Sequence, residues 1–315
     1  MNKGLYDTVG LRMPITNDEF LKIGEYLEGA KYHSRHIEGH IKNFRVVVRS
    51  KGIYLSGSVA TFLYGKNIHT LTHQEIPLAL YKLGEILHLD LFKAQVVSLD
   101  LAQTFGTQES PSMYFDYLGL HQNQKLNRHT KIGSLYYGFR TNKNLNLPKQ
   151  LCFYDKDAEM RLKQGRVVGG RNLLRYELRL RKQLQEQLGL EDPVTADMLM
   201  DEDFYQILLA VYQSEYDAIE KVPQFIDVVD LKKTSTPAKT SELIYALLLA
   251  EKLKQKPDFL SELHTKAKEC SIYSQSGYYK RLQEYHDEIL ETYTINKTSD
   301  LIKELDDKIL STAVS

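Results

Sequence analysis

Two kinds of hydrophobic pattern divide the chain. In the first 190 residues, apolar and polar positions alternate over short runs, which is typical of half-buried strands. These runs lie at 44–49, 53–57, 94–105 and 133–140. Ser50-Lys51-Gly52 predicts a hairpin turn between the first two. Segments 17–28 and 74–88 have helical spacing instead. Because strands and helices interleave and hairpins are present, we expect an α+β fold with an antiparallel sheet packed by helices.

The pattern changes after Gly189, and Glu191-Asp192-Pro193 marks a boundary. Beyond it, apolar residues recur at helical spacing in every long segment. These segments are 198–222, 241–254, 259–270, 277–292 and 299–311. We therefore expect an α+β domain at 1–190 and an α-helical domain at 191–315.

The strongest candidate chemistry lies on two predicted strands, 151–156 and 173–182. Alternation puts Tyr154 and Lys156 on one face of the first strand. On the second strand it puts the arginines and the glutamate on one face and the apolar residues on the other. The polar set is Arg175, Glu177, Arg179 and Arg181. A phenol beside a lysine, near a carboxylate among arginines, suits attack on a phosphodiester.

Tyr154 is one of 21 tyrosines, so a packing role stays open. An ordinary tyrosine, with a pKa of about 10, needs a cation, a metal or a base to react as phenolate. Asp100 and Glu177 are the candidate ligands of a divalent metal, and two carboxylates suit Mg²⁺ or Mn²⁺. The alternative is that both carboxylates form salt bridges only. Two further sets could bind a transition metal from one helix face: His33, His36 and His40, and His69 and His73.

A net charge of zero hides an asymmetry. Residues 1–190 hold 27 Lys and Arg against 17 Asp and Glu, whereas residues 191–315 hold 14 against 24. A basic first half is expected to bind a polyanion. Lys66 and Asn67, which follow Gly65, are candidate phosphate contacts. The longest apolar stretch, 243–250, is too short to cross a bilayer, so we expect a cytoplasmic protein without a membrane partner.

Four strings, taken in order, resemble the gene II/X family of phage and plasmid rolling-circle replication initiators. They are Gly-Ser-Val-Ala-Thr-Phe-Leu-Tyr-Gly-Lys-Asn at 57–67, Val-Val-Ser-Leu-Asp-Leu-Ala at 96–102, Phe-Tyr-Asp-Lys-Asp-Ala-Glu at 153–159 and Leu-Arg-Tyr-Glu-Leu-Arg-Leu at 174–180. Many rolling-circle nucleases bind their metal through His-x-His, which this sequence lacks. Carboxylates, or histidines distant in sequence, would have to replace that pair.

The resemblance implies a replication initiator that nicks one strand at an origin. Tyr154 would attack the phosphate with help from Lys156, leaving a 5′-phosphotyrosine and a 3′-OH primer, and the enzyme would later rejoin the strand. Arg175, Arg179, Arg181, Lys66 and Asn67 would hold the DNA. The partners would be single-stranded or hairpin origin DNA and a host helicase docked on the acidic half. A conjugative relaxase and a non-catalytic origin-binding protein are the alternatives.

Overall fold

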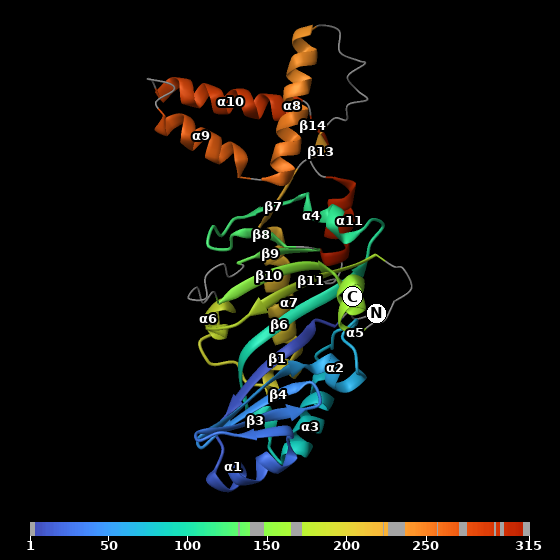
Figure 1. Cartoon of the computed structure of the whole chain (residues 1–315), viewed down its shortest axis with the longest axis vertical. Helices are drawn as coiled ribbons and strands as arrows, with labels where there is room; N and C mark the ends of the chain where they lie inside the picture. The colour runs from blue at the N-terminus through green and yellow to red at the C-terminus, as the bar shows by residue number, and fades with distance from the viewer. Residues whose placement is uncertain are drawn as a thin grey trace. The chain divides into compact units, whose positions relative to one another are not determined.

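The computed structural model describes residues 4–131, 133–138, 148–164, 172–222, 224–225, 237–256, 258–270, 276–292, 294–296 and 299–310 (Figure 1). The chain divides into two compact units. The first contains residues 1–111, 125–217 and 308–315, and the second contains residues 112–124 and 218–307. This division differs from the boundary expected near residue 190, because helix α7 (Glu202–Asp217) belongs with the sheet.

Ten antiparallel strands form the sheet of the first unit, so the expected α+β fold is confirmed. Their order is β2-β3-β4-β5-β1-β6-β11-β10-β9-β8. Their bounds are β1 (Tyr6–Met13), β2 (Glu28–Tyr32), β3 (His36–Ile41), β4 (Phe44–Arg49), β5 (Gly52–Ser58), β6 (Gln95–Gly106), β8 (Arg128–Lys131), β9 (Ser134–Tyr137), β10 (Lys149–Asp155) and β11 (Leu173–Leu180). The predicted hairpin is β4–β5. The strand expected at 133–140 is β9, and residues 139–140 lie outside the described residues.

One face of this sheet is apolar and carries the core. Alternate residues such as Val46, Leu55 and Leu178 are buried there. Helix α7 passes behind β6 and β11 in Figure 1. The hydroxyls of Tyr176 and Tyr212 each donate to the backbone oxygen of the other residue at 3.1 Å. This reciprocal pair of hydrogen bonds joins β11 to α7 on the apolar face. The opposite face of the sheet carries the polar side chains.

Shorter helices complete the first unit: α1 (Asn17–Ile23), α2 (Val59–Tyr64), α3 (Ile76–Leu87), α5 (Lys156–Gln164) and α6 (Leu184–Gln187). The helix expected at 74–88 is therefore α3. The expectation of a helix across the first histidine set is wrong, since His36 lies on β3 and His33 precedes it. The second set is not helical either, because His69 and His73 lie in the connection between α2 and α3.

The second unit is mainly helical, and helices dominate the C-terminal region as expected. Its elements are α4 (Pro111–Phe115), β7 (Leu118–His121), β12 (Ile219–Lys221), β13 (Gln224–Phe225), α8 (Pro237–Gln255), α9 (Phe259–Glu269), α10 (Ser276–Thr292), β14 (Thr294–Asn296) and most of α11 (Asp300–Leu310). Among the described residues, no helix is both long enough and apolar enough to span a bilayer.

Candidate active site

The polar face of the sheet gathers charged side chains from four adjacent strands, β1, β6, β11 and β10. The strand register sets their order, because side chains directly opposite each other on neighbouring strands share a face. Arg179 lies opposite Asp100 on one side and Gln150 on the other. Arg175 lies opposite Tyr154. The predicted division of the 173–182 strand into a polar and an apolar face is therefore confirmed.

Tyr154 lies half-buried on β10, with its hydroxyl directed at a carboxylate. The hydroxyl donates to Oε2 of Glu177 at 3.2 Å, and Nε of Arg179 donates to Oε1 of the same carboxylate at 2.8 Å. Burial, followed by the negative charge of Glu177, raises the pKa of Tyr154 above its usual value. Tyrosine, glutamate and arginine thus form a short hydrogen-bonded chain across β10 and β11.

Lys156 is not on the strand, which corrects the expectation that it shares a strand face with Tyr154. Strand β10 ends at Asp155, whose carboxylate accepts the backbone N–H of Ala158 at 3.0 Å and so caps α5. The ammonium of Lys156 nevertheless lies 5.8 Å from the centroid of the Tyr154 ring. Its side chain is 1 % exposed, and burial, followed by the positive charge of Arg175, lowers the pKa of Lys156.

Asn67 and Glu159 hold that ammonium in place. Nζ of Lys156 donates to Oδ1 of Asn67 at 2.9 Å and to Oε2 of Glu159 at 2.7 Å. The side chain of Asn67 is therefore turned into the site. Its neighbour Lys66 is exposed, just after Gly65 ends α2 with a φ of 71°. The structure thus brings Asn67 to Lys156 and leaves the adjacent Lys66 exposed to solvent.

Arg175 is fully buried under the site. Its guanidinium forms an ion pair with Oδ2 of Asp7 at 2.9 Å and donates to the backbone oxygen of Asn67 at 2.8 Å and to Oγ1 of Thr104 at 3.0 Å. With 0 % exposure, this guanidinium has no surface to offer a phosphate. Its place in the fold is that of a buried anchor for β1, β6 and the Asn67 loop.

Sequence reasoning missed Asp7. The β1–β6 register shifts between Tyr6 and Thr8, so Asp7 lies at a β-bulge, a feature that re-aims side chains. Its other carboxylate oxygen accepts the hydroxyl of Ser58 at 3.1 Å. The sequence does contain a signal for Asp7, because it is an acidic residue inside an apolar strand, as Asp100 is.

Asp100 and Glu177, the predicted metal ligands, are both buried and lie on adjacent strands. Both oxygens of Asp100 contact the guanidinium of Arg181, at 2.9 and 3.0 Å. Burial and the negative charge of Glu177 raise the pKa of Asp100 to about 7. Burial opposes ionisation of Glu177, but the charge and hydrogen bond of Arg179, together with Arg175 and the Tyr154 hydroxyl, outweigh it and lower the pKa of Glu177 to about 2.

This donor set fits a divalent cation. Oδ1 of Asp100 is buried, and within the described parts of the chain it makes the ionic contact with Arg181 but no hydrogen bond. A cation between the two carboxylates would relieve the repulsion that raises the pKa of Asp100. Arg179 and Arg181 would have to move away from the carboxylates. Both side chains reach solvent, being 28 % and 36 % exposed, respectively.

A second candidate metal site lies elsewhere. Among the described residues, His33, His36 and Glu38 form the group whose ligand atoms all lie within 4.8 Å of one another. His36 and Glu38 are on β3, six strands from β10 in the sheet order. At about 4.8 Å per strand, this group is about 29 Å from Tyr154. An ion there could not touch a phosphate at the tyrosine.

A comparison with protein families identifies the region that carries these residues. The family model Phage_CRI, which describes the N-terminal region of a replication-associated protein, matches residues 5–197, more than half of the chain. The matched region contains Tyr154, Lys156, Asp100 and Glu177. No curated protein matches the chain. The chain therefore belongs to this family of phage replication-associated proteins, a family of rolling-circle replication initiators.

Proposed function

We propose that this phage replication protein nicks one strand of its origin by attack of Tyr154 and later rejoins it. One observation carries the proposal: the hydroxyl of Tyr154 is hydrogen-bonded to a buried carboxylate, and the ammonium of Lys156 lies 5.8 Å from the centroid of the same ring. A nucleophile bonded to an acceptor, with a cation beside it, is the arrangement that activates a hydroxyl. The basic half of the chain suits a DNA substrate.

The covalent step exchanges one phosphoester bond for another. The oxygen of Tyr154 forms a bond to phosphorus while the bond from phosphorus to the 3′-oxygen breaks. The phenolic proton leaves through the hydrogen bond to Glu177. Lys156, whose lowered pKa eases proton release, donates a proton to the departing 3′-oxygen. The phosphotyrosyl bond retains the phosphodiester energy, so the reverse attack by a 3′-OH rejoins the strand.

Asp100 and Glu177 would hold a Mg²⁺ or Mn²⁺ ion. When bound, the ion would supply charge neutralisation at the scissile phosphate. Arg179 and Arg181 would then turn from the carboxylates toward the DNA backbone, which their partial exposure permits. Lys66 supplies a further phosphate contact from the Asn67 loop. Arg175 and Asn67 act as positioning residues, because their polar groups already bond Asp7 and Lys156.

The DNA at this site is single-stranded or extruded from a hairpin, so that a phosphate can reach a half-buried tyrosine. The acidic helical region is proposed as the docking surface for a host helicase. Its excess negative charge would attract a basic surface of the partner, since residues 191–315 hold 14 Lys and Arg against 24 Asp and Glu.

A covalent-adduct assay tests the nicking proposal. The protein is incubated with cognate origin oligonucleotide and Mn²⁺, and a DNA-shifted protein band is sought on a denaturing gel. We expect an adduct with the wild type and none with Tyr154→Phe. The matched control is Tyr136→Phe, which changes a neighbouring tyrosine on β9 directly opposite Cys152. It should form the adduct normally.

Three outcomes would redirect the assignment. If the wild type forms no adduct on a cognate origin that it binds, the protein is a non-catalytic origin-binding protein, a function favoured by the raised pKa of Tyr154. If the adduct survives Tyr154→Phe but not Tyr136→Phe, the nucleophile is the tyrosine on β9. If the protein nicks a conjugative transfer origin and not a replication origin, it is a relaxase.

A further inference from the structure

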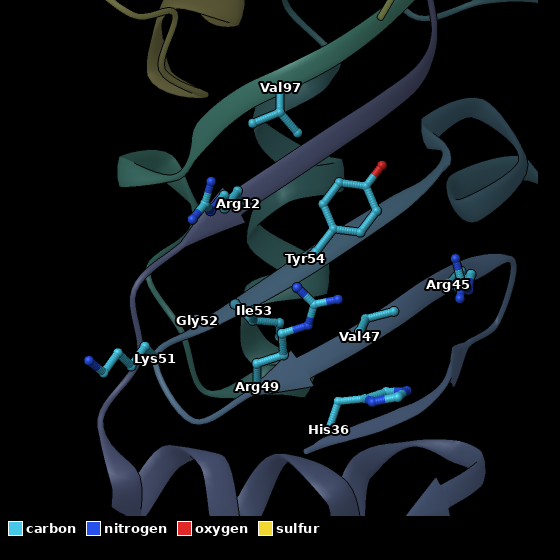
Figure 2. Close-up of a pocket in the computed structure, with 10 residues that line it drawn as sticks. All are labelled: Arg12, His36, Arg45, Val47, Arg49, Lys51, Gly52, Ile53, Tyr54 and Val97. Atoms are coloured by element: carbon cyan, nitrogen blue, oxygen red, sulfur yellow. The ribbon is translucent and has the colours of Figure 1, made fainter. Parts of the chain in front are cut away.

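A basic pocket lies on the same polar face of the sheet as Tyr154 but four strands away. It occupies about 580 Å³ over β3, β4, β5 and β1. Four cations line it: Arg12, Arg45 and Arg49 lie around Tyr54 in Figure 2, and Lys51 lies at the edge with its ammonium directed away from the ring. His36 closes one side, and Val47 and Val97 add apolar surface. None of these cations was singled out by the sequence patterns.

Three of the four cations have no acidic partner among the described residues. Within the described part of the chain, no hydrogen bond or ion pair engages the side chains of Arg12, Arg49 or Lys51, and all three are exposed. Arg45 shares its charge with Glu38 at 3.2 Å. Neighbouring positive charges raise the local electrostatic potential and attract an anion, most strongly one that carries several charges.

Tyr54 is half-buried at the centre of the pocket, and the backbone beneath it is built for a close approach. It lies opposite Arg12 in the β1–β5 register. A Cβ added at Gly10 would come within 2.1 Å of Oγ of Ser98 and 3.2 Å of the hydroxyl of Tyr54. Glycine therefore lets the tyrosine lie down across β1. An aromatic ring among unpaired cations is the composition of a single-strand binding surface, where bases stack and phosphates are neutralised.

The distance to Tyr154 matches a bound strand. From β5 to β10 the sheet order takes four steps, through β1, β6 and β11. At about 4.8 Å per step, the separation is about 19 Å. At the stacked spacing of about 3.4 Å per nucleotide, this corresponds to about six nucleotides, and to fewer if the strand is extended. Ser98, Asp100 and Arg179 lie along the way on the same face.

We propose that this pocket binds single-stranded DNA that flanks the scissile phosphate, with a base stacked on Tyr54 and phosphates held by Arg12, Arg49 and Lys51. The identification of the strand as substrate rests on the proposed nicking function. DNA would cross the strands of the sheet from Tyr154 to the pocket. The pocket would thus fix which phosphate reaches the tyrosine, by holding the strand at a second point.

The test measures binding in the Tyr154→Phe background, where no adduct is expected to form. Fluorescence anisotropy with a fluorescein-labelled oligo(dT) is compared for the triple variant Arg12→Gln, Arg49→Gln, Lys51→Gln and for a charge-matched control. The control is Lys22→Gln, Lys82→Gln, Lys93→Gln, three exposed lysines outside the pocket. We expect the pocket variant to lose about 10-fold or more in affinity at moderate salt, and its salt slope to fall by about 0.7 per phosphate contact removed.

Tyr54 is tested by a matched pair. Tyr54→Ala should weaken oligo(dT) binding about 5- to 150-fold, the range typical for loss of one stacked base, whereas Tyr54→Phe should bind like the parent. Circular dichroism checks that each variant is folded. Inorganic phosphate and dTMP serve as competitors and should displace the oligonucleotide only weakly.

The inference is overturned if the pocket variant and the lysine control bind oligo(dT) with equal affinity and salt slope. It is also overturned if dTMP or inorganic phosphate displaces the oligonucleotide as well as unlabelled oligo(dT) does, which would identify a small-anion site. Failure of the adduct assay with these binding effects intact would remove the nicking proposal only. A normal adduct with no pocket effect would remove this inference only.

Discussion

The hydroxyl of Tyr154 donates a 3.2 Å hydrogen bond to Glu177, a carboxylate whose other oxygen is held by Arg179. This contact joins the residue proposed as nucleophile to the residue proposed as metal ligand. Because Glu177 is 4 % exposed, water does not compete for it. The pair makes the site a single unit across two strands.

Glu177→Gln keeps the shape of the side chain and removes its charge. We expect the rate of adduct formation to fall about 10²- to 10⁴-fold, the range typical for loss of a proton acceptor, because an amide accepts the phenolic proton poorly. Single-turnover nicking of labelled origin DNA measures the rate. Glu186→Gln, an exposed change on α6, should react like the wild type. Nicking at the wild-type rate by Glu177→Gln would exclude the carboxylate from the reaction.

The buried ion pair between Asp7 and Arg175 predicts a large effect on stability. Arg175→Met leaves Asp7 charged and unpaired, which we expect to reduce the free energy of unfolding by about 3–5 kcal/mol. Asp7→Asn should also destabilise, and the double variant should cost less than the sum of the two. Urea denaturation of the wild type, the two single variants and the double variant gives the four free energies of unfolding in this double-mutant cycle. Arg45→Met, which breaks an exposed pair with Glu38, should leave the free energy of unfolding nearly unchanged. Additive effects would show that the pair is not coupled.

We expect the contribution of Asp100 to the free energy of unfolding to fall as pH rises. Its folded pKa of about 7 lies above the unfolded value of about 3.9, so the folded state binds the proton more tightly. The resulting stabilisation is present below the unfolded pKa and is lost as pH rises through about 7. In the presence of a chelator, Asp100→Asn should therefore unfold at higher urea than the wild type near pH 8 and show no such gain near pH 4.

An exposed aspartate supplies the control for that comparison. Asp90→Asn removes a partner of Lys93 that is 51 % exposed, and it should change the urea midpoint little at either pH. A lower midpoint for Asp100→Asn near pH 8 would mean that the ion pair with Arg181 outweighs the burial of the charge.

In the helical unit, Nε2 of His264 and Nδ1 of His286 lie 2.9 Å apart, and Nε2 of His286 contacts the hydroxyl of Tyr245 at 2.8 Å. Burial, followed by His264, lowers the pKa of His286. A histidine with a lowered folded pKa stabilises the fold above its unfolded pKa of about 6.5, and this stabilisation is lost as pH falls. We expect hydrogen exchange in α8, α9 and α10, corrected for intrinsic rates, to accelerate below about pH 6.

His286→Phe should flatten that pH dependence, since it removes the titrating ring from the contact between α9 and α10. His88→Phe, at the end of α3 in the other unit, is the control and should leave exchange in α8–α10 unchanged. Unaltered acceleration in His286→Phe would assign the effect to other groups.

Several parts of this fold could be predicted from short-range pattern. The β4–β5 hairpin follows from alternation around a Ser-Lys-Gly turn, and α3 follows from its apolar stripe. Alternation also predicted the two faces of β11. The histidines were assigned to helices wrongly, because a spacing of three or four residues suits one helix face while positions 36 and 40 of a strand also share a face.

Sequence alone selected the residues proposed to carry the chemistry, because side-chain type and local periodicity are properties of short segments. It singled out Tyr154, Glu177 and Asp100 in this way. Only the tertiary structure decided their partners. Asp7 is distant in sequence from Arg175, and Arg12 is distant from Arg49, yet sheet pairing brings these segments together. The order of strands in a sheet depends on long-range packing, so neither the buried ion pair nor the basic pocket could be read from local pattern.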